Sequence, residues 1–498
     1  MGLPPAAHHR AKPRAPRYSL AMTKPCTFQL NRRPVDLAGS DPTESLLRWL
    51  RRQQLAGTKE GCADGDCGAC TVALLQADAD GTTRMTAVNS CLLPLGALPG
   101  REVLTVEALR GPGGSLHPVQ QALVDCAGSQ CGYCTPGFVM SLFAGYYGGD
   151  LGDAAIEGNL CRCTGYRPIR DAAAALARQP VVDDAFAARL REPVTTPAGE
   201  LAGYHSPTTI ADAIALKQQV PQAVWIGGAT DLGVELSHGR RVATAFIALD
   251  RIAELQALDI ADDAVRIGAG LPLSQLETRL AGVFPALDQM LPWFAARQVR
   301  NRATFGGNLG TASPIGDLLP VLLALDATVH LHGPAGGRDI AITDYFHDYR
   351  KTARQPDELV VAVTVPRTAT APAQTHLSAS YKVAKRQTDD ISIVAAVFDL
   401  VLDAAHRVER ARLAYGGVAA TPRRAVNVEA YLLGRRLDAD TVNAAQDLLR
   451  DAFTPLDDHR AGADYRRALC AGLFAKFVAT HLPGAAKSDA TRAPGAAA

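Results

Sequence analysis

The stretch GCADGDCGACTV, residues 61–72, decides how the first part of this chain folds. Its cysteines, Cys62, Cys67 and Cys70, have C-x4-C-x2-C spacing, and Cys91 follows in the run NSCLLP. This spacing with a distant fourth cysteine is the plant-type pattern for a [2Fe-2S] cluster. Such a loop must wrap closely round inorganic sulfide and offer it backbone N–H groups, which requires the small residues that its glycines provide. The stretch therefore predicts a β-grasp domain with a cluster in this loop.

Two other kinds of site also use four cysteines, and neither suits this spacing. Zinc quartets usually come as two close pairs. Disulfides persist in oxidising compartments, and the N-terminal residues carry arginines and prolines without the apolar segment of a secretory signal. We therefore expect an iron–sulfur cluster at the first quartet.

A second quartet follows, in SQCGYCTPGF and GNLCRCTGYRPI. It consists of Cys131, Cys134, Cys161 and Cys163, which form two close pairs. Two close pairs are also typical of zinc sites, so the spacing leaves the metal open. A helix signal follows each pair, because Thr-Pro comes directly after Cys134 and a proline precedes the Ala-rich stretch beyond the second pair. Two helix N-termini at one site would stabilise thiolate charge, which favours a cluster.

The strings GCADGDCGACTV, QCGYCTPGF and GNLCRCTGYRPI closely resemble those of the xanthine dehydrogenase group of molybdenum hydroxylases, and all eight cysteine positions match. The resemblance implies [2Fe-2S] clusters at both quartets. It places the second cluster nearer a molybdenum centre and the first nearer a flavin. It also implies that Gln130 hydrogen-bonds the pterin cofactor of the molybdenum part.

Two glycine-rich segments follow: WIGGATDLG, residues 225–233, and RATFGGNLGTASPIGDLLP, residues 302–320. Glycines after a strand let backbone N–H groups close round a pyrophosphate, although ordinary turns have the same composition. Neither segment has the Rossmann fingerprint, and its nearest approach, Gly268-Ala-Gly270, has Leu273 in place of the third glycine. Both segments resemble the two FAD-binding loops of the xanthine dehydrogenase group and occur in the same order.

The resemblance implies which residues contact FAD. They are Trp225, Ile226, Gly227, Gly228, Ala229, Thr230, Asp231, Leu232, Phe294, Thr304, Phe305, Gly306, Gly307, Asn308, Asp317, Val360 and Lys382. Ala229 departs from the asparagine usual at its position, so one hydrogen bond to the cofactor is missing or is replaced by Thr230. By residue type alone, Phe294 and Val360 would equally be core residues, and Asp317 and Lys382 would equally be solvated surface charges.

The whole chain has the composition of globular material, with 498 residues, 47% hydrophobic content and 20% charged content. Lys and Arg exceed Asp and Glu by one, so charge gives no argument for nucleic acid or an anionic membrane as a partner. The longest apolar stretches, such as Ile391 to Leu402, fall short of the roughly 18 residues needed to span a bilayer. We expect a soluble, cytoplasmic protein.

Periodicity and composition predict an α+β multidomain chain. The expected parts are a disordered tail (1–22), a β-grasp ferredoxin domain (23–108), a helical-bundle [2Fe-2S] domain (109–180), a linker (181–203), an α+β FAD-binding domain (204–368), an α+β C-terminal domain (373–485) and a second tail (486–498). A short β-like segment opens just after Met22, which is a candidate for the true start.

Clusters and a flavin together predict an electron relay, because clusters pass single electrons while FAD stores two and can give a hydride to a nicotinamide. The resemblance implies the small subunit of xanthine dehydrogenase, with no catalytic residues of its own. A molybdopterin-binding large subunit would convert hypoxanthine to xanthine and xanthine to urate, in a heterotetramer of two small and two large chains, with NAD+ as acceptor. The alternatives are the small subunit of another molybdenum hydroxylase, oxidising aldehydes or N-heterocycles, and a stand-alone electron carrier. Asp389 and Asp390, in a segment that also resembles the family, have no assigned role.

Overall fold

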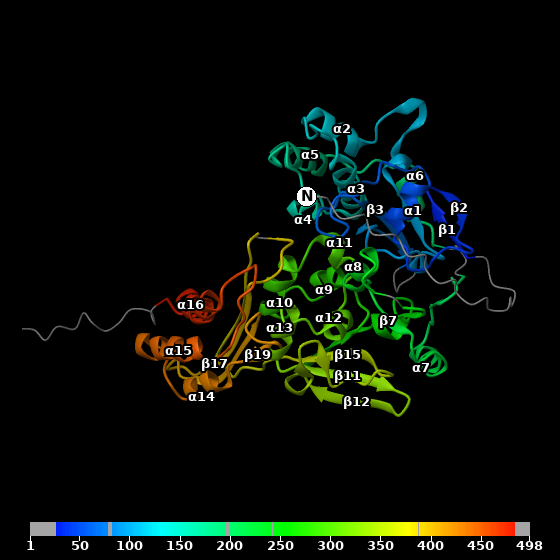
Figure 1. Cartoon of the computed structure of the whole chain (residues 1–498). Coiled ribbons are helices and arrows are strands. Elements are labelled where there is room, and N and C mark those ends of the chain that lie inside the picture. The colour runs from blue at the N-terminus through cyan, green and yellow to red at the C-terminus, as the bar shows by residue number, and fades with distance from the viewer. Residues whose placement is uncertain (1–25, 78–81, 195–198, 242, 387, 484–498) are drawn as a thin grey trace, which may run out of the picture.

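The computed structural model describes residues 26–483 apart from 78–81, 195–198, 242 and 387. The two expected tails and the candidate start at Met22 lie outside the described residues. Figure 1 shows four parts that follow one another along the chain, coloured blue, cyan, green and yellow to red. The first, third and fourth parts combine helices with sheets and the second is helical, so the predicted α+β multidomain class is confirmed.

The first part is a mixed five-stranded sheet with one helix packed on it. Its strands lie in the order β2-β1-β5-β3-β4, and the β1–β5 pair is parallel. The elements are β1 Thr27–Leu30, β2 Arg33–Asp36, β3 Thr71–Ala77, β4 Thr83–Asn89, β5 Glu102–Leu104 and α1 Leu46–Arg52. Helix α1 begins where the Ser45 side chain accepts a hydrogen bond from the Arg48 N–H. The first cysteine loop lies between α1 and β3 (Figure 1).

The second part is helical, as predicted. Its elements are α2 Pro118–Asp125, α3 Thr135–Gly148, α4 Asp153–Ile156, α5 Arg167–Ala177 and α6 Ala185–Leu190. Helix α6 lies in the segment expected to be a linker, where the Asp184 side chain accepts from the N–H groups of Phe186 and Ala187. Phe186 then packs edge-on against Phe143 of α3, with ring centroids 5.0 Å apart. Part of the linker is therefore attached to the helical part.

The third part contains three sheets, one of them the two-stranded pair β13-β14, and both glycine-rich segments. A parallel sheet has the order β6-β8-β7, and an antiparallel sheet has the order β12-β11-β15-β10-β9. The strands are β6 Tyr204–His205, β7 Val224–Ile226, β8 Phe246–Ala248, β9 Leu258–Ile260, β10 Ala264–Gly268, β11 Thr328–Gly333, β12 Gly336–Ala341, β13 Phe346–Asp348, β14 Lys351–Thr352 and β15 Leu359–Pro366. The helices are α7 Ile210–Gln219, α8 Leu232–Ser237, α9 Leu273–Arg279, α10 Pro285–Met290, α11 Arg297–Arg300, α12 Phe305–Thr311 and α13 Leu318–Ala324.

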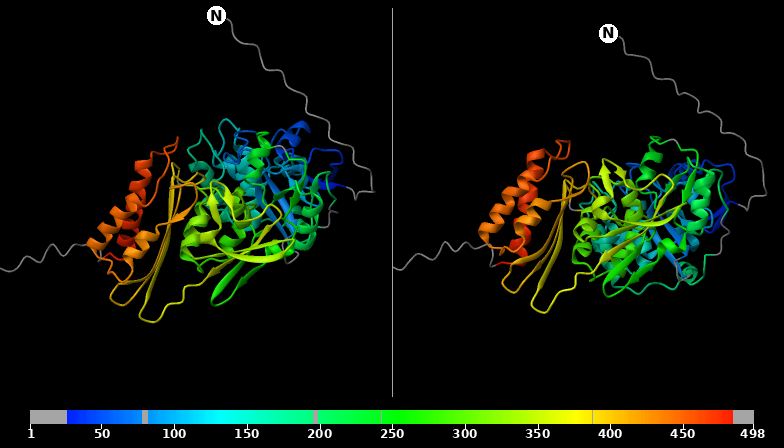
Figure 2. Two further views of the ribbon diagram at one scale, coloured as in Figure 1. Left: turned by 60° about the horizontal axis from the view of Figure 1, so that its bottom comes forward. Right: turned by 90° about the horizontal axis from the view of Figure 1, so that it is seen from below.

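The fourth part is an antiparallel sheet with helices on its outer face (Figure 2). Its elements are β16 Thr375–Val383, β17 Val394–Leu402, β18 Val408–Gly416, β19 Arg423–Arg424, α14 Val426–Leu432, α15 Ala439–Asp451 and α16 Ala463–His481. All nine residues of β17 are buried, because Phe398 packs on Phe474 and Phe477 of α16 while Val397 joins the core of the third part. Because both faces of β17 are covered, side chains on both faces are mostly apolar, which explains the apolar run from Ile391 to Leu402 in the sequence.

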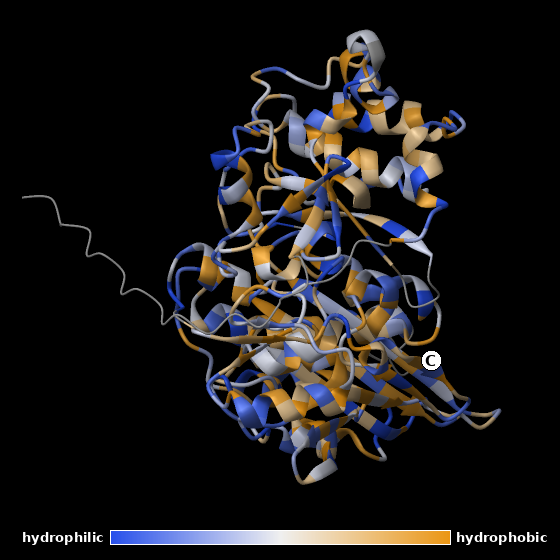
Figure 3. Ribbon diagram, turned by 90° about the vertical axis from the view of Figure 1, so that its right-hand side faces the viewer, coloured by the Kyte–Doolittle hydropathy of each residue, from blue (hydrophilic) through white to orange (hydrophobic). Residues whose placement is uncertain are grey.

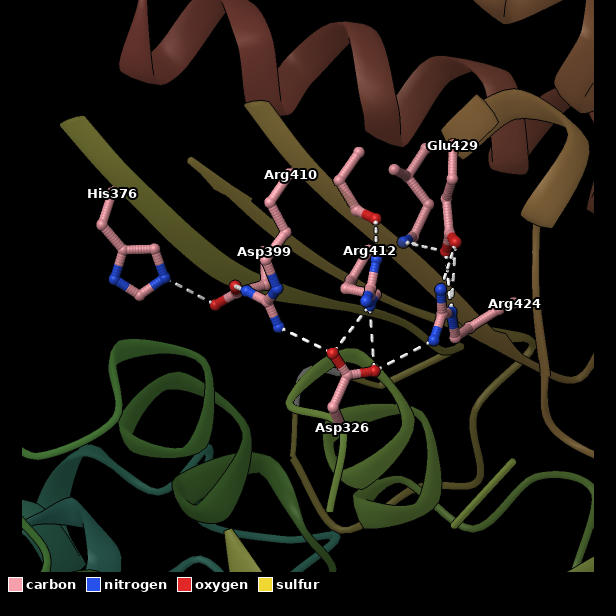
Figure 4. A network of polar contacts seen from close by, with 9 residues as sticks. Asp326, His376, Asp399, Arg410, Arg412, Arg424 and Glu429 are labelled. Atoms are coloured by element: carbon pink, nitrogen blue, oxygen red, sulfur yellow. Dashed lines mark hydrogen bonds and ion pairs between the residues drawn. The ribbon is translucent and has the colours of Figure 1, made fainter. Parts of the chain in front are cut away.

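A network of charged side chains ties this last sheet to the third part (Figure 4). Asp326, which follows α13, accepts from Arg410 at 3.0 Å, Arg412 at 2.8 Å and Arg424 at 3.0 Å. Asp399 of β17, fully buried, is paired with Arg410 and lies 2.8 Å from His376. A carboxylate inside a sheet requires such partners, so the network accounts for the one charge in that apolar strand.

Figure 3 shows apolar residues spread through the sheets and helices of every part of the fold. Within the residues that the structure describes, no helix combines the length and apolar character needed to cross a membrane.

Candidate functional site

The four thiols of the first quartet lie in two pairs. Cys70 Sγ is 3.3 Å from Cys91 Sγ, and both side chains are almost completely buried. Cys62 Sγ accepts hydrogen bonds from the backbone N–H groups of Asp64 and Cys67, both at 3.3 Å. The Cys62 N–H in turn donates to Cys67 Sγ at 3.4 Å. The loop therefore surrounds its sulfurs with amide donors, as the sequence led us to expect.

These contacts favour one thiolate in each pair. The hydrogen bond from the Cys67 thiol, together with the backbone donors, lowers the pKa of Cys62 to about 5. The hydrogen bond with Cys91 likewise lowers the pKa of Cys70. Thiolates are the form in which cysteines bind iron, so the loop is prepared for ligation.

Glycine is required at one point of this loop by the approach of the second part. Gly68 has φ +63°, and a Cβ there would lie 2.1 Å from the carbonyl oxygen of Gly158. Gly158 belongs to the GNLCRC segment of the second quartet. The two cysteine loops are therefore in backbone contact.

The second quartet also pairs its thiols but lies at the surface. The thiol of Cys131 interacts with that of Cys163, and the thiol of Cys134 with that of Cys161. Cys131 and Cys163 are exposed, while the other two are half-buried. Helix α3 begins directly after Cys134, which stabilises negative charge on that pair. Thr164 Oγ1 adds a side-chain hydrogen bond to Cys161 Sγ at 3.2 Å.

The arrangement of the thiols in twos suits a [2Fe-2S] cluster, in which four cysteines hold two irons. In the part of the chain that the structure describes, no three His, Cys, Asp or Glu side chains converge as ligands of a single metal ion. The residues that would hold the two clusters are thus Cys62, Cys67, Cys70 and Cys91, and Cys131, Cys134, Cys161 and Cys163.

A cavity of about 1360 Å³ lies between the first and third parts. Most of the predicted FAD contacts line it, namely residues 225–232, Phe294, Thr304, residues 306–308 and Val360. Trp225 Nε1 and Asn308 Oδ1 are buried without a partner among the described residues, so a bound ligand could satisfy them. Residues 64–66 of the first cysteine loop line the same cavity. The cavity therefore fits a flavin cofactor placed beside the first quartet.

The backbone of the first glycine-rich segment explains two of its residues. A Cβ on Gly228 would lie 1.8 Å from the carbonyl oxygen of Arg302, so the two segments meet backbone to backbone. Ala229 has φ +66°, in the left-handed region that asparagine tolerates better than alanine. The departure from asparagine at this position thus leaves a strained residue in the cavity wall.

Asp317 and Lys382 do not line the cavity, and they are not surface charges either. Both are buried, and Lys382 Nζ lies 2.7 Å from Asp317 Oδ2. Lys382 also donates to the carbonyl oxygen of Trp293 at 2.8 Å, and Ser392 Oγ donates to Asp317 Oδ1. Because Trp293 precedes the cavity residue Phe294, this ion pair supports the cavity wall from behind.

The two remaining predicted residues also lie outside the cavity. Phe305 is fully buried in the core of the third part. Gln130 is exposed at the surface beside Cys131, where a partner could reach it.

Several cavity residues were missed by the sequence analysis. Arg101 of the first part lies 2.6 Å from Asp250 of the third, and Arg302 lies 3.3 Å from the same carboxylate. Burial would raise the pKa of Asp250, but the arginines hold it below its usual value. Arg302 Nε also donates to the carbonyl oxygen of Gly228 at 3.3 Å. No local spacing signals this cluster, because Arg101 and Asp250 are 149 residues apart.

One of the two unassigned aspartates also lines the cavity. Asp389 is 5% exposed, and its Oδ2 has no partner among the described residues. Burial raises its pKa to about 7. Asp390 instead accepts hydrogen bonds from the backbone N–H groups of Arg386 and Ile391.

Four family models match the chain in sequence. They are a 2Fe-2S iron-sulfur cluster binding domain (residues 28–95), a [2Fe-2S] binding domain (105–174), the FAD binding domain in molybdopterin dehydrogenase (198–368) and the CO dehydrogenase flavoprotein C-terminal domain (379–481). Together they account for each of the four parts of the fold.

Curated relatives and solved structures agree with these matches. A xanthine dehydrogenase of Emericella nidulans is 32% identical over 90% of this chain and 38% of its own length, and one of Dictyostelium discoideum is 31% identical over 91% and 40%. The chain thus spans well under half the length of these relatives. A carbon monoxide dehydrogenase from Hydrogenophaga pseudoflava superposes with TM-score 0.52 and 27% identity, over 55% of this chain and 94% of that one. A quinoline 2-oxidoreductase from Pseudomonas putida 86, 24% identical with TM-score 0.53, shares the fold.

Fold, thiol pairs and cavity together define an iron–sulfur flavoprotein. The chain belongs to the molybdenum hydroxylase family, of which it contains the iron–sulfur and FAD-binding part.

Proposed function

We propose that this chain passes electrons from a molybdopterin-bearing partner through two [2Fe-2S] clusters to FAD and on to NAD+, as the electron-transfer subunit of a xanthine dehydrogenase. The observation that carries the proposal is the shared cavity, because residues 64–66 of the first cysteine loop and the glycine-rich segments line one space. A flavin bound there would lie next to the first cluster. Bound clusters supply one-electron steps, and bound FAD couples them to a two-electron hydride transfer.

The predicted site residues have different roles in this proposal. The exposed pair of the second quartet, with Gln130, faces the partner. Residues 225–232, Thr304 and residues 306–308 hold the cofactor diphosphate, and Phe294 and Val360 pack on it, while Phe305 anchors the second of these segments in the core. Asp317 and Lys382 support the wall that carries Phe294. The domain limits that we propose remain 23–108, 109–180, 204–368 and 373–485, with 181–203 between the second and third.

The proposed substrate reaction is the conversion of hypoxanthine to xanthine and urate on the partner. Xanthine dehydrogenases at about 30% identity favour it. The likeness to a carbon monoxide dehydrogenase favours a second candidate, the corresponding part of another molybdenum hydroxylase. We further propose a heterotetramer of two small and two large chains, located in the cytoplasm, where a reducing environment preserves free thiols.

Turnover of the complex purified from its native cells tests the proposal. We expect the chain to co-purify with a molybdenum-bearing partner, and xanthine to reduce NAD+ in the presence of both. If aldehydes or N-heterocycles reduce NAD+ in the presence of both chains and xanthine does not, the second candidate is selected. Purification of a flavin- and iron-loaded chain without any molybdenum partner would favour a stand-alone electron carrier.

A further inference from the structure

A buried set of polar side chains joins both cysteine loops to helix α11. Gln298 Nε2 donates to Ser141 Oγ at 3.1 Å and to Asn159 Oδ1 at 3.0 Å. Asn159 Nδ2 donates in turn to the carbonyl oxygen of Gly68, in the first cysteine loop, at 3.0 Å. Each of these three side chains is at most 2% exposed. Polar contacts of this kind fix geometry, because a buried group that loses its partner has no water to replace it.

Backbone contacts make the same junction tight. Leu160, between Asn159 and Cys161, donates its N–H to the carbonyl oxygen of Cys67 at 3.0 Å. A Cβ on Gly158 would lie 2.0 Å from Gln298 Oε1. The second cysteine loop is therefore held against the first on one side and against α11 on the other.

Arg300, two residues after Gln298, connects the same helix to the cavity wall. It is completely buried, and its Nη1 donates to three carbonyl oxygens in the segment 292–295, at 3.0 to 3.2 Å. Its other nitrogens pair with Glu157, just before the GNLCRC segment, and with Glu277. A buried guanidinium needs such partners, so each contact holds a defined position.

The wall segment itself requires this support. Phe294 lines the cavity, and its neighbour Ala295 has φ +46°, in the left-handed region unfavourable to alanine. Strained residues persist only where the surrounding structure holds them. One of the carbonyl oxygens that Arg300 holds belongs to Ala295.

We propose that Gln298 and Arg300 are positioning residues that hold the flavin-facing wall in register with both cysteine loops. Helix α11 lies at the junction of the cyan and green parts in Figure 1, where these contacts meet. Gln298 fixes the distance between the two cysteine loops. Arg300 fixes the position of the segment that carries Phe294 relative to those loops. This inference rests on the proposed function, since it assigns a purpose to the spacing of the electron carriers.

The test compares Gln298→Leu and Arg300→Met with Gln121→Leu and Arg170→Met, which change exposed residues of the helical part. The readouts are low-temperature EPR of the two reduced clusters, for their magnetic interaction, and visible circular dichroism of the bound flavin. In protein with native iron and FAD content, we expect Gln298→Leu to weaken the magnetic interaction and Arg300→Met to change the flavin dichroism. Arg300→Lys, which keeps the charge, should restore part of that signal, and the two exposed controls should match the native protein.

Unchanged magnetic interaction in Gln298→Leu and unchanged dichroism in Arg300→Met would overturn the inference while leaving the proposed function intact. If either variant does not fold, Ser141→Ala removes only the two hydrogen bonds of the Ser141 hydroxyl, to Asn159 and from Gln298, and its magnetic interaction must shift in the same direction as expected for Gln298→Leu. A native protein without two clusters and a flavin would overturn the proposed function and this inference together.

Discussion

The first cysteine quartet is enclosed and the second is open. Cys70 and Cys91 are 2% and 1% exposed, and their loop lines the cavity, whereas Cys131 and Cys163 lie at the surface. Sulfurs of the first quartet receive hydrogen bonds from backbone amides, while Cys161 of the second also receives one from a side-chain hydroxyl. The difference is consistent with the proposed electron order, in which the open quartet faces a partner and the enclosed one serves the flavin.

Ligand removal should separate the two quartets most strongly. Either Cys91→Ser or Cys131→Ser should lower the iron content from about four to about two per chain, because each cluster needs four cysteines. Only Cys91→Ser should also lower FAD occupancy, since its cluster holds the loop that lines the cavity. Iron analysis, EPR and flavin absorbance check this. Equal FAD loss in both variants would contradict the assigned order.

Glycine replacement should show how closely the first loop is packed. Gly68→Ala and Gly132→Ala both place alanine at positive φ, which costs about 1–2 kcal/mol. Gly68→Ala also forces a Cβ into the backbone of Gly158, and overpacking typically adds about 1–3 kcal/mol, while the space around Gly132 is open. Thermal unfolding measures the stability of both variants. If Gly132→Ala loses more stability than Gly68→Ala, the close packing of the first loop is refuted.

Lowering the pH should destabilise the helical part, which carries the second quartet, through protonation of His117. This residue caps α2 and is buried, and burial lowers its pKa to about 4. The histidine of the unfolded chain has a pKa near 6.5. Between about pH 4 and pH 6.5, His117 therefore carries a proton in the unfolded chain but not in the folded chain. Stability from His117 is complete above about pH 6.5 and is lost as pH falls toward 4.

Thermal melts between pH 7 and pH 4.5, followed by helical circular dichroism, measure this dependence. His117→Gln should flatten it, and His459→Gln, at an exposed position, should leave it unchanged. A slope that is the same in native protein and His117→Gln would remove His117 as its cause.

The smallest expected effect concerns the Thr164 hydroxyl. Thr164→Val removes the hydrogen bond to Cys161 Sγ, whereas Thr164→Ser keeps a hydroxyl. A bond of about 0.5–1.5 kcal/mol corresponds to a decrease of about 20–60 mV in the one-electron potential of the second cluster. Potentiometric EPR titration resolves the two clusters, and a shift confined to the first would contradict the assignment.

Local spacing made the two quartets predictable from the sequence. Cys62, Cys67 and Cys70 lie close together in one glycine-containing loop, although Cys91 follows 21 residues after Cys70. The apolar run Ile391 to Leu402 was visible in the sequence, but only the structure shows that it contains strand β17 and that both faces of this strand are covered. The four parts of the chain were recognised in their correct order, and the family matches follow that order.

Contacts between distant segments could not be predicted in this way. Gln298 and Asn159 are 139 residues apart, and the ion pair of Asp317 and Lys382 spans 65 residues. Residue type alone left both charged residues as candidate surface groups, because burial is decided by tertiary packing. The resemblance implies that both contact FAD, which stays a prediction, and only the folded chain reveals that they pair with each other and that Lys382 bonds the carbonyl oxygen of Trp293.

Metal and flavin analysis with low-temperature EPR, on protein purified from its native cells, tests the central claim most directly. We predict about four iron and one FAD per chain and two distinct signals, as two four-cysteine clusters require. Zinc in place of iron, or a single iron–sulfur signal with no flavin, would contradict the account.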